Sequence, residues 1–293
     1  MEDTQKKTVV VILEGDLSSI EYEGCDSIEV YKVTNLFQYE SYVKSVIAKR
    51  LAHVSVVIQF TTIESLTKVM YFLNQFDGNR QTQKAKFIKQ LEKFARELQP
   101  ETTGDKVSVT LAQGQCELPL SFPVTILFDS NQIKDNELSP ATIFNLQLAR
   151  YIALKHGGDI IAASNIGSII TAKNIPTILN LEIPPKPIFS VGNDTIVIYI
   201  PQAWDSWNKI ILQGKSIVSS NNDDVIRQES NLAQLNMHYD DFFHGNTSNL
   251  SGVFAHLHNS TTKPSTTEPQ DPPKQVISIS EFLQEIVQPS IVE

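Results

Sequence analysis

The sequence has little cysteine and fewer basic than acidic side chains. Cys25 and Cys116 are the two cysteines among 293 residues. They are too few for a disulfide framework or a four-ligand zinc site, and this usage is typical of a reducing compartment. The 24 Lys and Arg residues are outnumbered by 33 Asp and Glu residues, which gives a net charge of −9. Non-specific binding to nucleic acid or to an anionic membrane therefore lacks its electrostatic attraction.

Long apolar runs are missing as well. No stretch of about 18 apolar residues occurs, so we expect no direct membrane insertion. The polar start, Met1–Lys7, lacks the apolar region of a signal peptide, and a cytoplasmic protein is expected. Hydrophobic residues nevertheless make up 41% of the chain, which allows a sizeable core and excludes disorder of the whole chain.

Short β-branched runs alternate with amphipathic helical patterns over the first half of the chain. Helices are predicted at Tyr39–Ala52, after the capping pair Thr61 and Glu64, at 80–98, and from Ser139 to Gly157. Alternation of this kind predicts an α/β fold, a doubly wound, mostly parallel sheet with helices on both faces, in an order that resembles a Ras-like domain. The predicted strands are Val9–Leu13, Ile28–Val33, Val54–Phe60, Phe122–Phe128 and Asp159–Ala163.

A Ras-like order raises the question of a nucleotide, because such domains hold phosphates in a Gly-rich loop after the first strand. Here that strand is followed by Glu14-Gly15-Asp16-Leu17-Ser18-Ser19, with carboxylates where backbone amides and a Lys would face phosphate. Gly214-Lys215-Ser216 lacks its upstream glycine, since Lys209 stands there, and Asp129-Ser130-Asn131-Gln132 lacks the Asn-Lys-x-Asp pattern of guanine specificity. We therefore expect no cofactor, no catalytic residue and no enzymatic activity.

Other polar clusters have simpler interpretations. His244, His256 and His258 have no acidic or Cys ligand at a fixed spacing, so no metal site is expected. The adjacent carboxylates of Asp223-Asp224 and Asp240-Asp241 diverge and do not form an acid–base pair. One helix is basic for an acidic protein, and its cations are interpreted as a solvated face, with an acidic partner as the alternative. These residues are Arg80, Lys84, Lys86, Lys89, Lys93 and Arg96.

The second half of the chain predicts a domain followed by a tail. Residues 1–228 are expected to form the Ras-like domain with an appended strand at Thr195–Ile200, and residues 229–243 a helix that packs on this domain or on a partner. Residues 244–275, rich in Asn, Ser, Thr and Pro, predict a disordered linker. Residues 276–289 predict an amphipathic helix whose apolar face is Ile279, Phe282, Leu283, Ile286 and Val287. We expect this helix to bind a partner, although folding back on its own domain is the alternative.

Three stretches point to a family. They are Leu148–Ser164 (LARYIALKHGGDIIAAS), Asp194–Leu212 (DTIVIYIPQAWDSWNKIIL) and Phe282–Val287, which has two large apolar, two polar and two aliphatic residues in order. With these stretches in this order, the chain resembles the light intermediate chain of cytoplasmic dynein. Some members of that family retain a phosphate-loop sequence, which this chain lacks.

The resemblance implies a non-catalytic motor subunit of microtubule-based transport in the cytoplasm. It implies that the Ras-like domain binds the tail of the dynein heavy chain and that coiled-coil cargo adaptors capture the terminal helix. The adaptor-binding residues would be Ile279, Phe282, Leu283, Ile286 and Val287. The heavy-chain-binding residues would be Trp204, Asp205, Leu232, Leu235, Tyr239 and Phe242. Packing of Trp204 and Trp207 inside the domain is the alternative, and the helix that contains Leu232 has a similar one.

Two further functions remain as alternatives. An active small GTPase of motor or membrane traffic would need the phosphate loop that is missing here. A pseudo-GTPase scaffold of another assembly would keep the fold without the dynein heavy chain.

Overall fold

The structure is a computed structural model in two compact units. Unit 1 comprises Met1–Asn131 and Leu148–Trp207, and unit 2 comprises Gln132–Gln147 and Asn208–Glu293. The predicted division at residues 228, 243 and 275 stays a prediction. The structure describes residues 6–24, 27–98, 109–129, 137–138, 140–163, 187–191, 196–214, 229–245 and 277–278.

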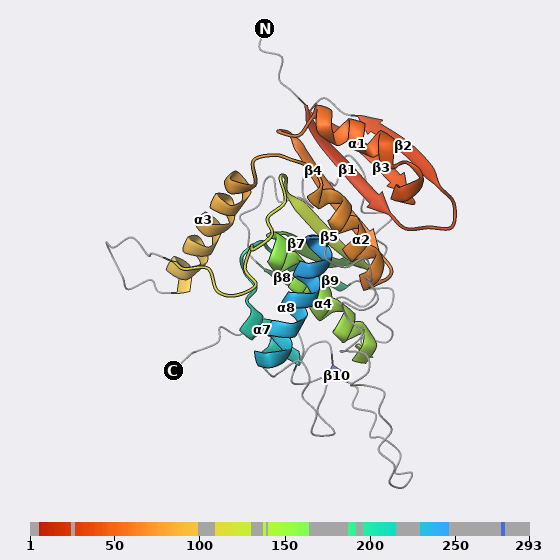
Figure 1. Ribbon diagram of the computed structural model, residues 1–293. Coiled ribbons are helices and arrows are strands. Elements are labelled where there is room, and N and C mark those ends of the chain that lie inside the picture. The colour runs from red at the N-terminus through yellow and green to blue at the C-terminus, as the bar shows by residue number, and fades with distance from the viewer. Residues whose placement is uncertain are drawn as a thin grey trace, which may run out of the picture. The chain divides into compact units, whose positions relative to one another are not determined.

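Unit 1 is built on an 8-stranded sheet in the order β2-β3-β1-β4-β5-β7-β9-β8 (Figure 1). Strands β3, β1, β4, β5 and β7 pair in parallel, whereas β2 joins one edge and β9 and β8 extend the other through antiparallel pairings. This order confirms the predicted α/β fold with a mostly parallel, Ras-like sheet. The bounds are β1 Lys7–Leu13, β2 Ser19–Gly24, β3 Ile28–Thr34, β4 Val54–Phe60, β5 Val124–Asp129, β7 Asp159–Ala163, β8 Ile188–Val191 and β9 Ile196–Ile200.

The central strands are apolar on both faces, as a sheet that is covered on both sides requires. All five inner residues of β1 are buried, and β4 is buried at every position except Gln59. Among the described residues, buried strand side chains form one hydrophobic cluster of the sheet. It comprises Val9, Val11, Ile28, Val30, Val57, Leu127, Ile161 and Tyr199.

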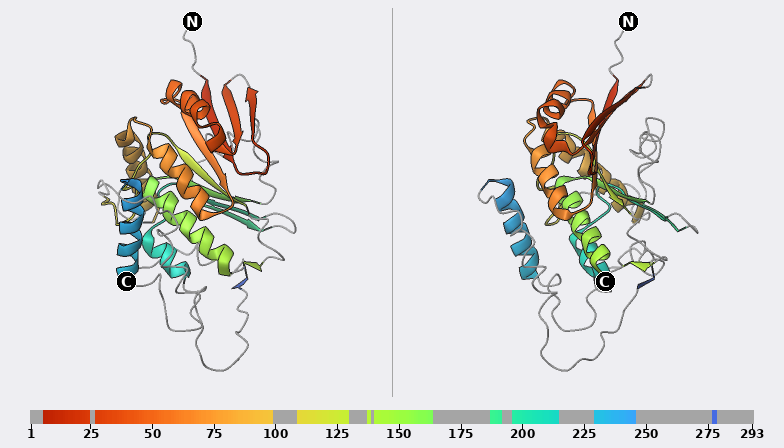
Figure 2. Two further views of the ribbon diagram at one scale, coloured as in Figure 1. Left: turned by 45° about the vertical axis from the view of Figure 1, so that its right-hand side comes forward. Right: turned by 90° about the vertical axis from the view of Figure 1, so that its right-hand side faces the viewer.

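Helices α1 (Glu40–Lys49), α2 (Ile63–Asn74) and the Leu148–His156 part of α4 (Pro140–His156) lie side by side on one face of the sheet (Figures 1 and 2). Their connections all step across the sheet in the same direction, from β3 to β4, β5 and β7. Right-handed crossovers that step one way place their helices on one face. Helices on the opposite face stay a prediction.

Helix α3 (Arg80–Leu98) occupies a different place, beyond the amino ends of the strands (Figure 1). Its inward residues include Phe87, which is fully buried, and Phe94, whose ring contacts that of Trp204 at a centroid distance of 5.1 Å. A 3-10 turn, η1 (Leu36–Gln38), precedes α1.

The start of α2 differs from the sequence prediction. The N-cap is Thr62 rather than Thr61, because the Thr62 side chain accepts a hydrogen bond from the Ser65 N–H at 3.1 Å. The Thr61 hydroxyl is bonded to another part of the chain, described below. The predicted pairing of Thr61 with Glu64 is therefore wrong by one position.

Unit 2 contains α7 (Trp207–Gly214), apart from its first residue, and α8 (Glu229–Phe243), which has the predicted bounds. Tyr239 stacks on Phe243 in α8 with ring centroids 4.6 Å apart. Unit 2 also contains a two-stranded antiparallel pairing of β6 (Glu137–Leu138) and β10 (Ile277–Ser278). Since Ile277 and Ser278 are extended, the predicted terminal helix cannot begin before Ile279.

At the turn between α4 and β7, the pKa values of His156 and Asp159 are shifted in opposite directions. Gly157, with φ 71°, ends α4 as predicted, and His156 before it hydrogen-bonds through Nδ1 to the Leu118 carbonyl at 2.7 Å. Burial lowers the pKa of His156 to about 3. Burial raises the pKa of Asp159 to about 6, although hydrogen bonds with Thr125, its own backbone and Tyr199 act to lower it.

These two groups predict opposite contributions to acid stability. Unfolded His156 gains a proton near pH 6.5 but folded His156 only near 3, so it removes stability as the pH falls through that window. Asp159 takes up its proton near pH 6 when folded and near 3.8 when unfolded, so it adds stability over that window. The advantage in unfolding free energy of the wild type over His156→Gln should fall by about 1.4 kcal/mol per pH unit below 6.5.

Urea unfolding of both proteins across this pH range measures the difference. The advantage of the wild type over Asp159→Asn should change in the opposite direction below pH 6. Differences that do not vary with pH would contradict both assignments.

Candidate functional site

The carboxyl ends of β1 and β4 form the edge at which a Ras-like domain would hold phosphate. In this chain β1 connects to β2 through the five residues Glu14–Ser18, with no helix between them. A phosphate-binding loop presents the free N–H groups of a helix start. Here the connection is too short to form that helix.

Glu14 fills this edge with its own carboxylate. Its Oε2 accepts a hydrogen bond from the Thr61 backbone N–H at 2.6 Å and another from the Thr61 hydroxyl. Thr61 directly follows β4 and precedes the N-cap of α2, so the carboxylate is held beside the amino end of that helix. A negative charge is favourable there. Glu14 thus supplies from within the chain the anion that a helix start otherwise attracts.

Asn35 fastens the other side of the same connection. It has the left-handed φ of 61° that Asn adopts more readily than most residues, and its backbone N–H donates to the Leu13 carbonyl at 3.0 Å. Its side-chain Nδ2 donates to the Gly15 carbonyl at 2.8 Å and to the Ser18 hydroxyl at 3.1 Å. The connection is therefore bonded to the ends of both β3 and β4.

This arrangement suits a structural closure rather than chemistry on a substrate. The Thr61 N–H at this edge already donates to Glu14, and the fixed carboxylate would repel a phosphate. Among the described residues, no group of three or more His, Cys, Asp or Glu side chains is placed to hold a metal ion. No described helix is both long and apolar enough to cross a membrane.

Comparisons with known proteins give a likeness in structure and none in sequence. No family model matches the chain, and no curated protein matches it in sequence. In structure it is similar to the crystal structure of the dynein light intermediate chain's conserved domain, at 15% sequence identity and a TM-score of 0.46. The similarity covers 98% of this chain and 100% of that one. A likeness of this extent carries no argument about what the chain does.

The predicted heavy-chain residue Asp205 is engaged inside unit 1. It is 6% exposed, and its carboxylate accepts from Nε of Arg150 at 2.8 Å and from an Arg150 terminal nitrogen at 2.5 Å. Arg150 is 1% exposed, and the Gln115 side chain donates to the Asp205 carbonyl at 3.2 Å. Breaking a buried pair of this kind costs about 3–5 kcal/mol. Asp205 therefore has a structural role, while contact with a heavy chain stays a prediction.

Trp204 is half-buried against Phe94 of α3. Trp207 packs its ring near Tyr151 at a centroid distance of 5.8 Å. Both tryptophans therefore pack inside the domain, as the alternative predicted. The heavy-chain role of Trp204 stays a prediction.

A second ion pair supports the same region. The Lys155 ammonium lies 2.6 Å from the Glu117 carboxylate, and the Gly114 N–H donates to the other carboxylate oxygen at 2.9 Å. Burial alone would raise the pKa of Glu117, but these hydrogen bonds and nearby cations hold it below its usual range. The backbone N–H of Cys116 also donates to the Leu154 carbonyl at 2.8 Å, which satisfies a carbonyl at the end of α4.

The remaining predicted residues lie on α8 and in the terminal helix. Tyr239 is fully buried and Phe242 is 8% exposed, whereas Met237 on the same helix is 53% exposed. Leu232 and Leu235 belong to α8, but their side chains lie outside the described residues. All five predicted adaptor-binding residues also lie outside them. These residues are Ile279, Phe282, Leu283, Ile286 and Val287.

Sequence reasoning did not identify Thr61 as the partner of Glu14, or Arg150 as the partner of Asp205. Each pair is far apart in sequence, by 47 and 55 residues. Glu14 did carry a usable signal, because an acidic residue directly after the first strand is unfavourable for phosphate binding. Arg150 also gave a usable signal, because it is a charged residue among the apolar residues of a predicted helix.

Glu14→Ala is expected to lower the free energy of unfolding by about 1–2 kcal/mol, since it removes a charge-assisted hydrogen bond at a helix start. Asp16→Ala is the matched control, because Asp16 is exposed in the same connection and carries the same charge. Chemical denaturation measures both. Equal losses in the two variants would show that loop charge, rather than the bond to Thr61, is responsible.

Proposed function

We propose that the chain is a non-catalytic light intermediate chain subunit of cytoplasmic dynein. Its Ras-like domain binds the tail of the dynein heavy chain, and its C-terminal helix binds coiled-coil cargo adaptors. It acts in microtubule-based transport, in the cytoplasm and on the cytoskeleton. It has no enzymatic activity and uses no cofactor.

The closure of the carboxyl edge by Glu14 is the observation that carries the non-catalytic part. A nucleotide at this edge would need donors for its phosphates. The Thr61 N–H is taken by the Glu14 carboxylate at 2.6 Å. This position is also held from the other side by Asn35. Such an edge favours a domain that serves as a platform for other proteins.

The assignment to dynein rests on the sequence resemblance, and a buried ion pair joins two of the stretches that carry it. Arg150 lies in the first resembling stretch, Leu148–Ser164, and Asp205 in the second, Asp194–Leu212. The pair joins these two stretches in unit 1, with Arg150 fully enclosed. The residues that carry the resemblance are therefore also those that hold the platform together.

The adaptor role rests on the amphipathic pattern of the terminal segment. Five apolar side chains, buried at about 1.5–3 kcal/mol each, supply about 7–15 kcal/mol for docking of the helix, before ordering and association costs remove much of it. The Pro-, Ser- and Thr-rich residues 244–275 suit a tether that displays this helix to a groove on a partner.

Phe282→Ala combined with Leu283→Ala is expected to weaken adaptor capture by at least about a hundredfold, because both central anchors of the helix are removed. Association with the heavy chain should be unchanged, since the sheet domain is untouched. Gln284→Ala combined with Glu285→Ala, on the polar side of the same helix, should leave both activities intact. Affinity purification followed by mass spectrometry measures all three proteins, together with a chain that ends at residue 275.

Three outcomes separate the alternatives. Loss of the heavy chain together with the adaptors in the Phe282 and Leu283 variant would contradict the two-part organisation. Failure of the full chain to recover any heavy chain would favour a pseudo-GTPase scaffold of another assembly. Equal adaptor recovery by the chain that ends at residue 275 would place adaptor binding outside the terminal helix.

A further inference from the structure

A cavity of about 620 Å³ opens at the amino edge of the sheet in unit 1. Its walls come from the start of β1, the loop before β4, the residue before β5 and the first turns of α3. This is the opposite edge from the one that Glu14 closes. Its volume lies within the range of small-molecule sites, about 300–1,000 Å³.

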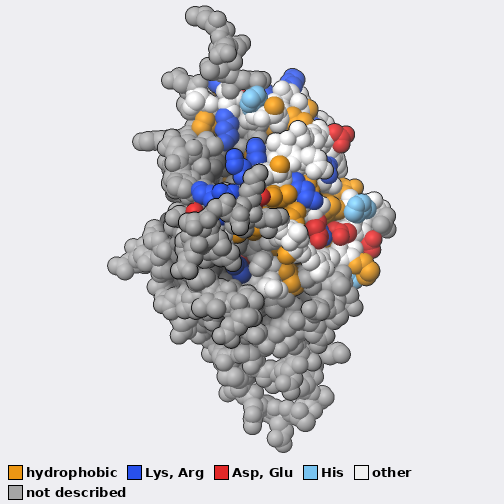
Figure 3. Space-filling view, turned by 90° about the vertical axis from the view of Figure 1, so that its left-hand side faces the viewer, with side chains coloured by type: hydrophobic (Ala, Val, Ile, Leu, Met, Phe, Trp, Pro, Cys, Tyr) orange, Lys and Arg blue, Asp and Glu red, His pale blue; other side chains and the backbone are white. Residues whose placement is uncertain are grey.

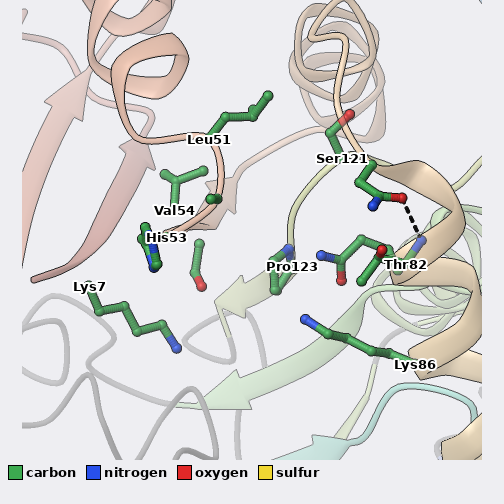
Figure 4. Close-up of a pocket in the computed structure, with 12 residues that line it drawn as sticks. Lys7, Leu51, His53, Val54, Thr82, Lys86, Ser121 and Pro123 are labelled. Carbon is green, nitrogen blue, oxygen red and sulfur yellow. Dashed lines mark hydrogen bonds between the residues drawn. The ribbon is translucent and has the colours of Figure 1, made fainter. Parts of the chain in front are cut away.

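Two lysines face each other across this cavity. Lys7 extends from the start of β1 and Lys86 from α3, and both ammonium groups point into the same space (Figure 4). Burial lowers the pKa of Lys7, and the charge of Lys86 lowers it further. Across the described part of the chain, neither ammonium has a carboxylate partner, and no Asp or Glu lines the cavity. Two like charges are thus held together without a counter-ion from the described residues.

The surface around the cavity is also positive, although the chain as a whole carries −9. The first half of α3, residues 80–90, contains four basic residues and no acidic one. Lys and Arg side chains gather on this side of the molecule in the space-filling view (Figure 3). The amino end of α3 also contributes the positive end of its helix dipole.

Polar groups that can bind an anion line the same cavity. Thr82, Gln83 and Asn79 contribute from α3 and its N-cap, and His53 contributes from the opposite wall. The Asn79 side chain is oriented because its Oδ1 accepts from the Thr82 N–H at 3.0 Å. Hydroxyl, amide and ammonium donors therefore converge on one volume.

We propose that this cavity is a binding site for a phosphate group, carried either by a free small anion or by a phosphorylated side chain of a partner. A phosphate monoester carries close to two negative charges at neutral pH and three acceptor oxygens. It can therefore neutralise Lys7 and Lys86 together, whereas one carboxylate neutralises one of them. The site lies apart from the closed carboxyl edge and does not depend on the assignment to dynein.

Isothermal titration of the full chain at low, constant ionic strength tests the site with three probes: inorganic phosphate, a short phosphoserine peptide with otherwise neutral residues, and succinate. Phosphate is expected to bind one per chain, and Lys86→Gln to weaken it at least about tenfold through loss of a charge-assisted contact. Lys93→Gln is the matched control, because Lys93 is exposed on the same helix outside the cavity. It should change the affinity less than twofold. Thermal unfolding of both variants checks that each remains folded.

Tighter binding of the phosphoserine peptide would identify a protein-borne phosphate, and equal or weaker binding a free anion. Both results support a phosphate site. Absence of saturable binding by either phosphate probe would overturn the proposal. Equal weakening by Lys86→Gln and Lys93→Gln, or succinate binding as tight as phosphate, would also overturn it.

Discussion

A guanidinium that is buried away from water needs a carboxylate partner, and this need determines how the last strands of unit 1 connect back to α4. Arg150 is buried on α4, and its partner Asp205 lies later in the chain, after β7, β8 and β9. The segment after β9 must therefore return to α4. There it brings Trp204 to Phe94 of α3 and Trp207 to Tyr151 of α4. The segment after β9 thus links the sheet extension to α4 through the ion pair and Trp207, and to α3 through Trp204.

The carboxyl ends and the amino ends of the parallel strands, called here the carboxyl edge and the amino edge, have opposite electrostatic character. At the carboxyl edge, Glu14 is bonded to Thr61 and gives a closed, negative surface. At the amino edge, Lys7 and Lys86 leave an open, positive cavity. A Ras-like fold normally offers the first edge to phosphate. In this chain the positive charge that favours an anion lies at the amino edge.

The positions of the central strands could be predicted from the sequence because these strands are β-branched runs bounded by turns. The edge strand β2 could not, since its burial is partial and its residues, Ser19–Gly24, are mostly polar. The predicted N-cap missed by one residue because Thr61 and Thr62 are equally suitable caps, and only the contact with Glu14 separates them. Pairs such as Arg150 and Asp205 depend on topology, which spacing in one sequence does not give.

The central claim is that this Ras-like domain serves as a platform and does not bind a nucleotide at its carboxyl edge. Titration of the full chain with fluorescent GDP and GTP, in the presence of Mg²⁺, tests it most directly. We expect no saturable binding, because the Glu14 carboxylate occupies the position where phosphate donors are needed. Stoichiometric binding with micromolar affinity that is lost on mutation of the carboxyl edge would contradict the account.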